Sequence, residues 1–94
     1  MYKQGYVYLL TNSSRALLYT GVTSNLIKRL WEHENKIYPN SYTAKYNIHI
    51  LVYYEVFDSI ITAIQREKEI KGWSRKKKDA LIEKRNSKWE RLAI

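Results

Sequence analysis

Four side chains in the first third of the chain are of the types that handle phosphate esters. Tyr8 and Tyr19 lie in two aromatic segments, and Arg29 and His33 follow at a spacing of one helical turn. A guanidinium can hold a phosphate through two parallel hydrogen bonds, and an imidazole or a phenol can carry a proton. If the chain brings these groups together, the chemistry that they suit best is that of a phosphodiester.

Each of these side chains also has a purely structural explanation. The chain contains nine tyrosines, and strands favour tyrosine for packing reasons alone. A phenol has a pKa of about 10, which must be lowered before it can act as a base, and Arg29 or a metal ion would lower it. Arg29 lies at the margin of an apolar helix face beside His33, which favours a phosphate contact over a solvated role.

Glu67 is the carboxylate whose position asks for an explanation. It falls inside an apolar helical stripe formed by Ile60, Ala63, Ile64 and Ile70, and a carboxylate there is costly unless it is paired or metal-bound.

Two interpretations of Glu67 stay open. One is a helix salt bridge with Lys71, four residues on, which contributes about 0.3–0.5 kcal/mol. The other is a ligand for Mg²⁺ or Mn²⁺. One glutamate suffices if DNA and water supply the remaining oxygens, as is common for magnesium.

The elements that must position these groups alternate between strands and helices. Alternating aromatic and β-branched residues predict strands at 5–11 and 16–22, joined as a hairpin, and a third strand at 48–56 buried at the sheet centre. Capping residues predict helices from Ser24 or Asn25 to about Asn35, from Asp58 or Ser59 to about Lys71 with a stop at Gly72, and from Ser74 to about Arg85. Residues 37–45 are expected to form a loop, and in the tail 86–94 we expect Trp89 and Leu92 to pack on the domain.

The first helix is expected to face the core through Leu26, Ile27 and Leu30, with Trp31 at the edge of this face. Arg29 and His33 then lie together on its flank and border the core.

Composition narrows the class of protein. The 94 residues fit one domain, 1–94, and 45% hydrophobic residues suffice for a core. The chain has no cysteine and only two histidines, which excludes disulfides and His-rich metal cages. It shows no signal-peptide pattern and no apolar run near the roughly 20 residues of a membrane span. We therefore expect a soluble, cytoplasmic protein.

The charge favours a polyanionic partner. Seventeen Lys and Arg face nine Asp and Glu, for a net charge of +8 and a pI near 9.7. Nucleic acid is the first candidate, before an anionic membrane surface or an acidic protein. The basic run Arg75, Lys76, Lys77 and Lys78 is either a solvated helix face or an electrostatic footprint for nucleic acid. Such a footprint cannot specify a base sequence.

The order and spacing of these groups resemble a known pattern. Tyr6-Val7-Tyr8 followed by Tyr19-Thr20-Gly21 resembles the paired signature of the GIY-YIG nuclease superfamily. Arg29, His33 and Glu67 match this family's helix arginine, its Tyr or His position and its metal-binding glutamate. The most similar group is that of small stand-alone proteins related to the N-terminal nuclease domain of the bacterial excision-repair incision enzyme.

The resemblance implies a fold and an activity. The fold is an α/β (α+β) domain with a three-stranded antiparallel sheet flanked by three or more helices. The activity is divalent-metal-dependent hydrolysis of DNA, in the setting of DNA repair. Glu67 would hold Mg²⁺ or Mn²⁺, Arg29 would neutralise charge on the phosphoryl group, and Tyr19, helped by His33, would take a proton from water. Tyr8 would hydrogen-bond into this cluster or touch phosphate.

The chain departs from the family pattern at two positions. Tyr6 replaces the glycine of the first motif, and Val22 stands where the repair-type domains carry a lysine. Lys45, in the loop before the third strand, is the candidate replacement for that lysine. Val22 keeps a second hypothesis open, a basic module that binds nucleic acid without cutting it. A third is a protein-interaction domain with an acidic partner. No small-molecule cofactor is expected, and a protein partner would supply specificity.

Overall fold

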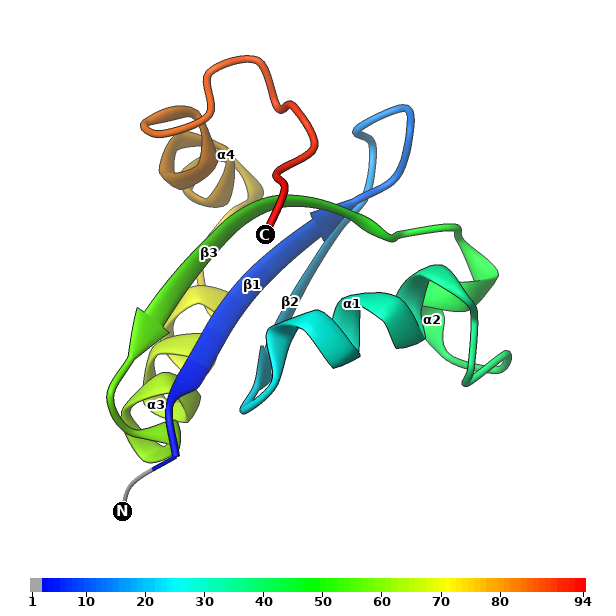
Figure 1. Ribbon diagram of the computed structural model, residues 1–94. Helices are drawn as coiled ribbons and strands as arrows, with labels where there is room; N and C mark the ends of the chain where they lie inside the picture. Colours follow the sequence, from blue (N-terminus) through cyan, green and yellow to red (C-terminus); the bar gives the residue numbers. More distant parts are fainter. Residues whose placement is uncertain (1–2) are drawn as a thin grey trace.

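The computed structural model describes residues 3–94 and has three strands and four helices (Figure 1). In chain order these are β1 (Gly5–Thr11), β2 (Leu18–Thr23), α1 (Leu26–Glu34), α2 (Tyr42–Lys45), β3 (Ile50–Phe57), α3 (Ile60–Lys71) and α4 (Arg75–Glu83). The strands form one antiparallel sheet flanked by the helices. The predicted α+β class is therefore confirmed, and the short helix α2 lies in the segment expected to be a loop.

The strand order is β2-β1-β3, so β1 is central and β3 lies at an edge. The prediction that the third strand occupies the centre was wrong. Its apolar run has another cause, because both faces of β3 are covered. Val52 packs toward one core cluster and Leu51 toward the other. The C-terminal tail also covers part of the outer edge, where the backbone N–H of Leu92 donates to the carbonyl of Leu51 at 2.9 Å.

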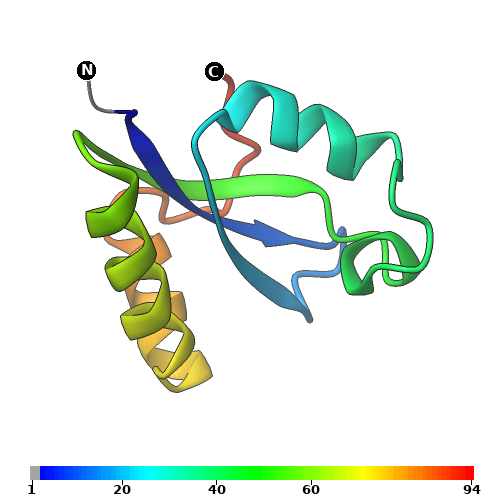
Figure 2. The same cartoon turned by 90° about the horizontal axis from the view of Figure 1, so that it is seen from below.

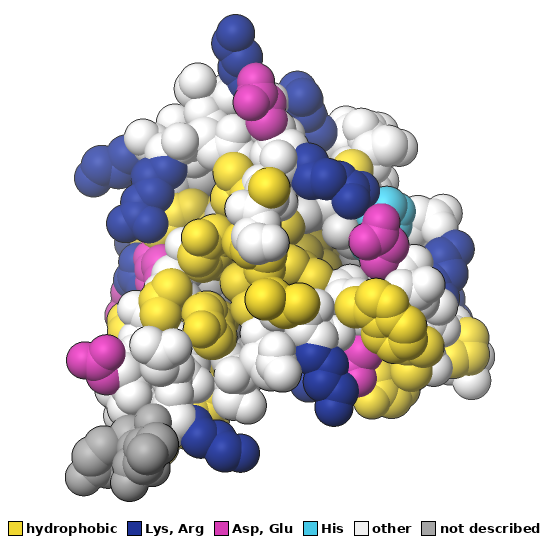
Figure 3. Space-filling model, viewed as in Figure 1, with side chains coloured by type: hydrophobic (Ala, Val, Ile, Leu, Met, Phe, Trp, Pro, Cys, Tyr) yellow, Lys and Arg dark blue, Asp and Glu magenta, His cyan; other side chains and the backbone are white. Residues whose placement is uncertain are grey.

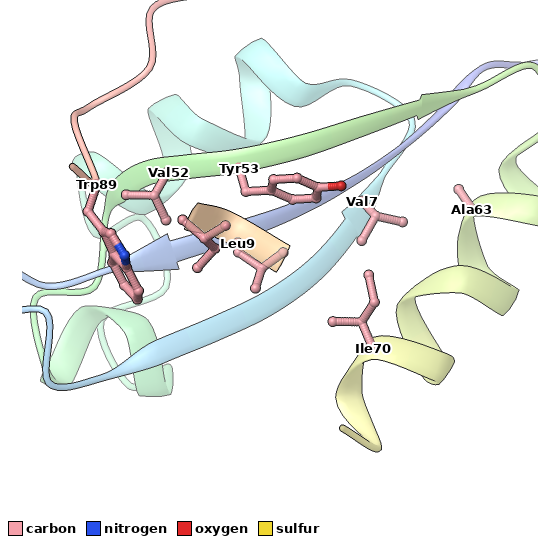
Figure 4. Close-up of a cluster of buried hydrophobic side chains, with 8 residues drawn as sticks. Val7, Leu9, Val52, Tyr53, Ala63, Ile70 and Trp89 are labelled. Atoms are coloured by element: carbon pink, nitrogen blue, oxygen red, sulfur yellow. The ribbon is translucent and has the colours of Figure 1, made fainter. Parts of the chain in front are cut away.

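The sheet separates two layers of helices. Helices α3 and α4 lie on one side and α1 and α2 on the other, as seen from below in Figure 2. The larger core lies under α3 and α4, and Figure 4 shows it as a cluster of side chains from the sheet, both helices and the tail. Its members are Val7, Leu9, Val52, Tyr53, Ala63, Ile70, Ile82 and Trp89. The smaller core faces α1 and consists of Tyr8, Leu10, Leu26, Ile48 and Leu51.

Helix α1 begins at the predicted cap, where the Asn25 side chain accepts a hydrogen bond from the backbone N–H of Lys28. It packs on the sheet through Leu26, which is buried, and Leu30. Ile27, expected on the core side, is instead 69% exposed, and Trp31, expected at the edge of this face, is 58% exposed. Each follows a packed residue by one position, which is a rotation of about 100° around the helix axis. Because α1 contacts the sheet along one narrow line, this rotation points both side chains away from the sheet.

Helices α3 and α4 begin at the predicted caps Ser59 and Ser74, whose side chains accept from backbone N–H groups in the first turn. Helix α3 ends at Gly72, as expected. The tail turns without forming a helix, and Trp89 packs into the larger core while its indole N–H donates to Glu83. None of the helices within residues 3–94 has the length and apolar character needed to span a bilayer.

One face of the molecule has an apolar centre with basic side chains at its margins (Figure 3). On the face seen in Figure 3, apolar side chains gather at the centre and Lys and Arg side chains surround them. On this face the basic side chains therefore lie at the margins, where long flexible cations remain in water.

Candidate functional site

Three rings from three elements meet beside the smaller core. Tyr8 on β1, Tyr19 on β2 and His33 on α1 have ring centroids separated by 6.2 Å (Tyr8–Tyr19), 5.8 Å (Tyr8–His33) and 5.6 Å (Tyr19–His33). The hydroxyl of Tyr8 lies 2.9 Å from Nε2 of His33. The structure thus brings together both phenols and the imidazole, and it makes Tyr8 the hydrogen-bonding partner of His33.

Gly21 makes this approach possible. It lies directly opposite Tyr8 in the pairing of β1 with β2. A Cβ placed on Gly21 would overlap Cζ and the hydroxyl of Tyr8 and would lie 2.9 Å from Cε2 of Tyr19. The glycine of the second motif is therefore a steric requirement of the phenol pair.

Arg29 borders a pocket of about 200 Å³ that is also lined by Tyr19 and His33. Its guanidinium is half-exposed, and Nε lies 3.1 Å from a carboxylate oxygen of Glu32. A pocket with a guanidinium, a phenol and an imidazole on its wall has the groups that a phosphate and a proton transfer need. The other lining residues are Glu32, Lys36, Tyr38, Ser41, Tyr42, Thr43 and Ala44.

The protonation of the ring cluster follows from its surroundings. Burial raises the pKa of Tyr8 well above its usual value, the Tyr19 phenol raises it further, and the Arg29 guanidinium opposes this. Tyr8 is thus a neutral phenol near pH 7. Burial lowers the pKa of His33, and Arg29 lowers it further against the opposing charge of Glu32, so the imidazole is neutral as well.

Glu67 is buried on α3, with 7% of its surface exposed, as its place in the apolar stripe predicted. Its Oε2 lies 2.8 Å from Nζ of Lys71, so the helix salt bridge is present. The hydrogen bond from Lys71 to Glu67 raises the pKa of this lysine. The charge of Glu67 also contributes, as the smallest cause, to the raised pKa of Tyr8. Glu67 is not among the lining residues of the pocket.

Glu67 is a single carboxylate, which suits only an ion that is held mainly by phosphate and water. Among the residues that the structure describes, no three Asp, Glu or His side chains gather to hold a metal, so Glu67 would be the single carboxylate ligand. Mg²⁺ is commonly bound in this way in phosphate-processing sites. Lys71 is 54% exposed, so its side chain is free to turn into solvent and leave the carboxylate to a cation.

The positions that depart from the family pattern have structural roles. Val22 packs against the larger core, and the hydroxyl of Tyr6 donates to Oε1 of Gln4 at 3.1 Å. Lys45 is exposed at the end of α2 and is not among the lining residues of the pocket. The lysine on the pocket wall is Lys36.

Arg75 is engaged by the protein itself. Its guanidinium donates to Oδ1 of Asp79 and to the carbonyls of Arg15 and Ala16, each at 2.7 Å. It therefore ties α4 to the turn between β1 and β2. Of the basic run, Lys76 and Lys77 are exposed and Lys78 is half-buried, and Nζ of Lys77 lies 4.2 Å from the ring centroid of Trp73.

We expect Arg75→Gln to lower the stability of the fold and to leave its affinity for DNA nearly unchanged. Three charge-assisted hydrogen bonds at a partly exposed site contribute about 1–2 kcal/mol, or about 5–10 °C in Tm for a domain of this size. The matched variant, Lys76→Gln, should keep Tm and reduce the slope of log affinity against log salt by about one. Thermal unfolding and a salt titration of DNA binding measure both, and an unchanged Tm in Arg75→Gln would contradict the structural role.

Sequence reasoning missed the pocket residues that follow α1, in the irregular segment before α2 and in α2 itself. Lys36, Tyr38 and Thr43 carry no periodic signal, because this segment is irregular apart from the single turn of α2. The one available signal is compositional, since a lysine and two tyrosines, Tyr38 and Tyr42, lie close together around the only proline.

Comparison with known proteins identifies the family of the chain. The profile of the GIY-YIG catalytic domain matches residues 4–80. A UPF0213 protein of Syntrophus aciditrophicus is 42% identical over 79 residues, covering 84% of this chain and 90% of that protein. A UPF0213 protein of Natronomonas pharaonis is 43% identical over 77 residues, covering 82% and 88% respectively.

A solved structure is similar as well. The solution NMR structure of a UPF0213 protein from Bacillus halodurans has a TM-score of 0.58 and 27% sequence identity, with 94% of this chain and 92% of that chain covered. The family match spans both tyrosine motifs, Arg29, His33 and Glu67. The chain therefore belongs to the GIY-YIG family of nuclease-like domains, in the group of the UPF0213 proteins.

Proposed function

We propose that the protein is an endonuclease that hydrolyses phosphodiester bonds in DNA with the help of Mg²⁺ or Mn²⁺. The observation that carries the proposal is the meeting of the Tyr8, Tyr19 and His33 rings. Tyr19 and His33 line one pocket together with Arg29. Membership of a nuclease-like family and a net charge of +8 support the same activity.

Each side chain of the cluster has a separate task in this proposal. Arg29 binds the scissile phosphate and neutralises the charge that grows on it. Tyr19, on the pocket wall, is the proposed base, helped by His33: its phenol first gives up its proton to solvent, and the phenolate oxygen then takes the proton of the attacking water. Tyr8 is fully buried and has a raised pKa, so it acts as a hydrogen-bond donor to His33 and not as the base.

Glu67 is the proposed ligand of the divalent cation. When bound, Mg²⁺ or Mn²⁺ supplies Lewis-acid stabilisation of negative charge on a phosphate oxygen. Glu67 holds a buried negative charge on α3, and Lys71 neutralises that charge until a cation replaces it. Lys45, Lys76, Lys77 and Lys78 are proposed to attract the DNA backbone without reading its sequence.

The direct test is nicking of supercoiled plasmid by the wild-type protein, with single-stranded and branched DNA as further substrates. We expect cleavage with Mg²⁺ or Mn²⁺ and none after chelation. Arg29→Ala is the companion variant and should lose most of the rate. Absence of cleavage from every DNA form, with either metal, would end the proposal.

The competing function is a basic module that binds nucleic acid without cutting it. The Lys71 ion pair favours it, because it occupies Glu67, the proposed metal ligand. This module would retain DNA at low salt, release it steeply as salt rises and show no metal dependence. Salt-sensitive retention without cleavage in the same experiments would select it.

A further inference from the structure

A chain of hydrogen bonds continues from the ring cluster into the segment before β3. Nε2 of His33 faces the hydroxyl of Tyr8 at 2.9 Å, and Nδ1 of the same ring lies 3.0 Å from Oγ1 of Thr43. Oγ1 of Thr43 in turn lies 3.3 Å from Oγ of Ser41. Both nitrogens of the imidazole are therefore engaged, one by a phenol from the sheet and one by a hydroxyl from α2.

Thr43 is held in place more firmly than most residues of its segment. Only 4% of its surface is exposed, and its backbone carbonyl accepts from the N–H of Ile48 at 2.9 Å. Ser41 is the N-cap of α2, and its Oγ accepts from the backbone N–H of Ala44. The hydroxyl that faces His33 thus belongs to a fixed part of the pocket wall.

The direction of these hydrogen bonds follows from the available donors. A neutral imidazole has one N–H donor and one acceptor nitrogen, and burial together with Arg29 lowers the pKa of His33 and keeps it neutral. Tyr8 is fully buried, and Nε2 of His33 is the hydrogen-bond partner of its hydroxyl within residues 3–94. If Nε2 carried the ring proton, the phenol O–H would be left without an acceptor, so Tyr8 donates and Nε2 accepts.

This direction assigns the other proton as well. If Nε2 accepts from Tyr8, the ring proton lies on Nδ1 and is donated to Oγ1 of Thr43. The Thr43 hydroxyl can then donate to Oγ of Ser41. Tyr8, His33 and Thr43 each donate one hydrogen bond along the chain in this arrangement, and Ser41 Oγ accepts from both Thr43 and the backbone N–H of Ala44.

We propose that Thr43 is a positioning residue that fixes His33 in the Nδ1–H tautomer, so that the Nε2 lone pair faces Tyr8. In the other tautomer, an N–H would point at the Tyr8 oxygen and turn the phenol proton toward the pocket. Thr43 thereby decides whether the buried phenol presents an acceptor or a donor to the groups around it. The consequence for catalysis rests on the proposed function, whereas the tautomer itself does not.

The tautomer can be read without any activity. Long-range ¹H–¹⁵N correlation spectra of the imidazoles, recorded above the pH at which they are protonated, distinguish a protonated from an unprotonated ring nitrogen. In the wild-type protein we expect protonated Nδ1 and unprotonated Nε2 at His33. Thr43→Val removes the acceptor with little change in volume and should shift His33 to the Nε2–H form or to a mixture. Thr43→Ser keeps the hydroxyl and should restore the wild-type spectrum.

The second histidine provides an internal reference. His49 is half-buried, with its Nδ1 3.5 Å from a terminal nitrogen of Arg91, and it has no hydrogen bond with Thr43. Its resonances should be the same in all three proteins, which shows that Thr43→Val is folded. A wild-type His33 with Nε2 protonated, or a tautomer that does not respond to Thr43→Val, would overturn the inference.

Loss of the Thr43 hydroxyl should lower kcat and leave KM nearly unchanged. Partners one hydrogen bond removed from a reacting group typically contribute about 10- to 100-fold, so we expect Thr43→Val to lower kcat about tenfold or more with KM nearly unchanged. Thr43→Ser should recover most of the rate. If the wild-type protein cuts no DNA and Thr43→Val still shifts the tautomer of His33, the endonuclease is refuted and the role of Thr43 toward His33 stands.

Discussion

Replacement of Glu67 by glutamine is expected to lower the rate of DNA cleavage by about 100- to 1,000-fold, the size of effect that follows loss of one charged stabilising contact. Glutamine keeps the shape of the side chain and removes the charge, so the core under α3 should remain packed. Plasmid nicking at a series of Mg²⁺ and Mn²⁺ concentrations measures the effect, and thermal unfolding shows that the fold is intact.

Lys71→Met is the variant that separates a metal ligand from a structural ion pair. If Glu67 matters only through its bond to Lys71, both substitutions should damage the protein alike. If Glu67 holds a cation, Lys71 competes with that cation. Lys71→Met should then keep the rate at saturating metal and lower the metal concentration at half-maximal rate. Full cleavage by Glu67→Gln would exclude Glu67 as the ligand.

The second large effect is expected from Gly21→Ala. The added Cβ would overlap the ring of Tyr8 and crowd the ring of Tyr19, so one or both phenols must move. Overpacking of this kind costs about 1–3 kcal/mol, and a displacement near 1 Å at a reacting group can cost about 100-fold in rate. Thermal unfolding and plasmid nicking measure the two losses separately.

Gly72→Ala is the matched control for this substitution. Gly72 has a φ of −77°, and a Cβ there would meet its nearest neighbour, the carbonyl oxygen of Glu69, at an ordinary 3.5 Å. Such a replacement should leave cleavage unchanged and raise stability by about 0.4–1 kcal/mol. Equal behaviour of the two alanine variants would show that the close approach at Gly21 is dispensable.

The sequence was most informative where neighbouring residues decide the structure. Caps at Asn25, Ser59 and Ser74 depend on a side chain and a backbone N–H two or three positions away, and these helix starts were predicted correctly. The inward position of Glu67 followed from helical spacing, but the same spacing also serves the Lys71 salt bridge. The pattern therefore could not choose between them, and the structure contains the pair.

Long-range packing decided the predictions that failed. The edge position of β3 depends on which strand pairs with which, and an apolar run does not contain that information. Ile27 and Trp31 are exposed because α1 contacts the sheet along a narrower line than its apolar residues suggest. Lys36 reaches the pocket from an irregular segment and Thr43 from the single turn of α2, so no period in the sequence marks them.

The opposition of Tyr8 and Gly21 across β1 and β2 also bears on how the sheet chooses its alignment. In an antiparallel pair, a slipped alignment would put Thr20, Val22 or another residue with a side chain beneath the Tyr8 ring, where only a bare Cα leaves room. The contact between Tyr8 and Gly21 therefore fits only the native register of β1 with β2. The same pair of residues that shapes the ring cluster thus disfavours misaligned hairpins during folding.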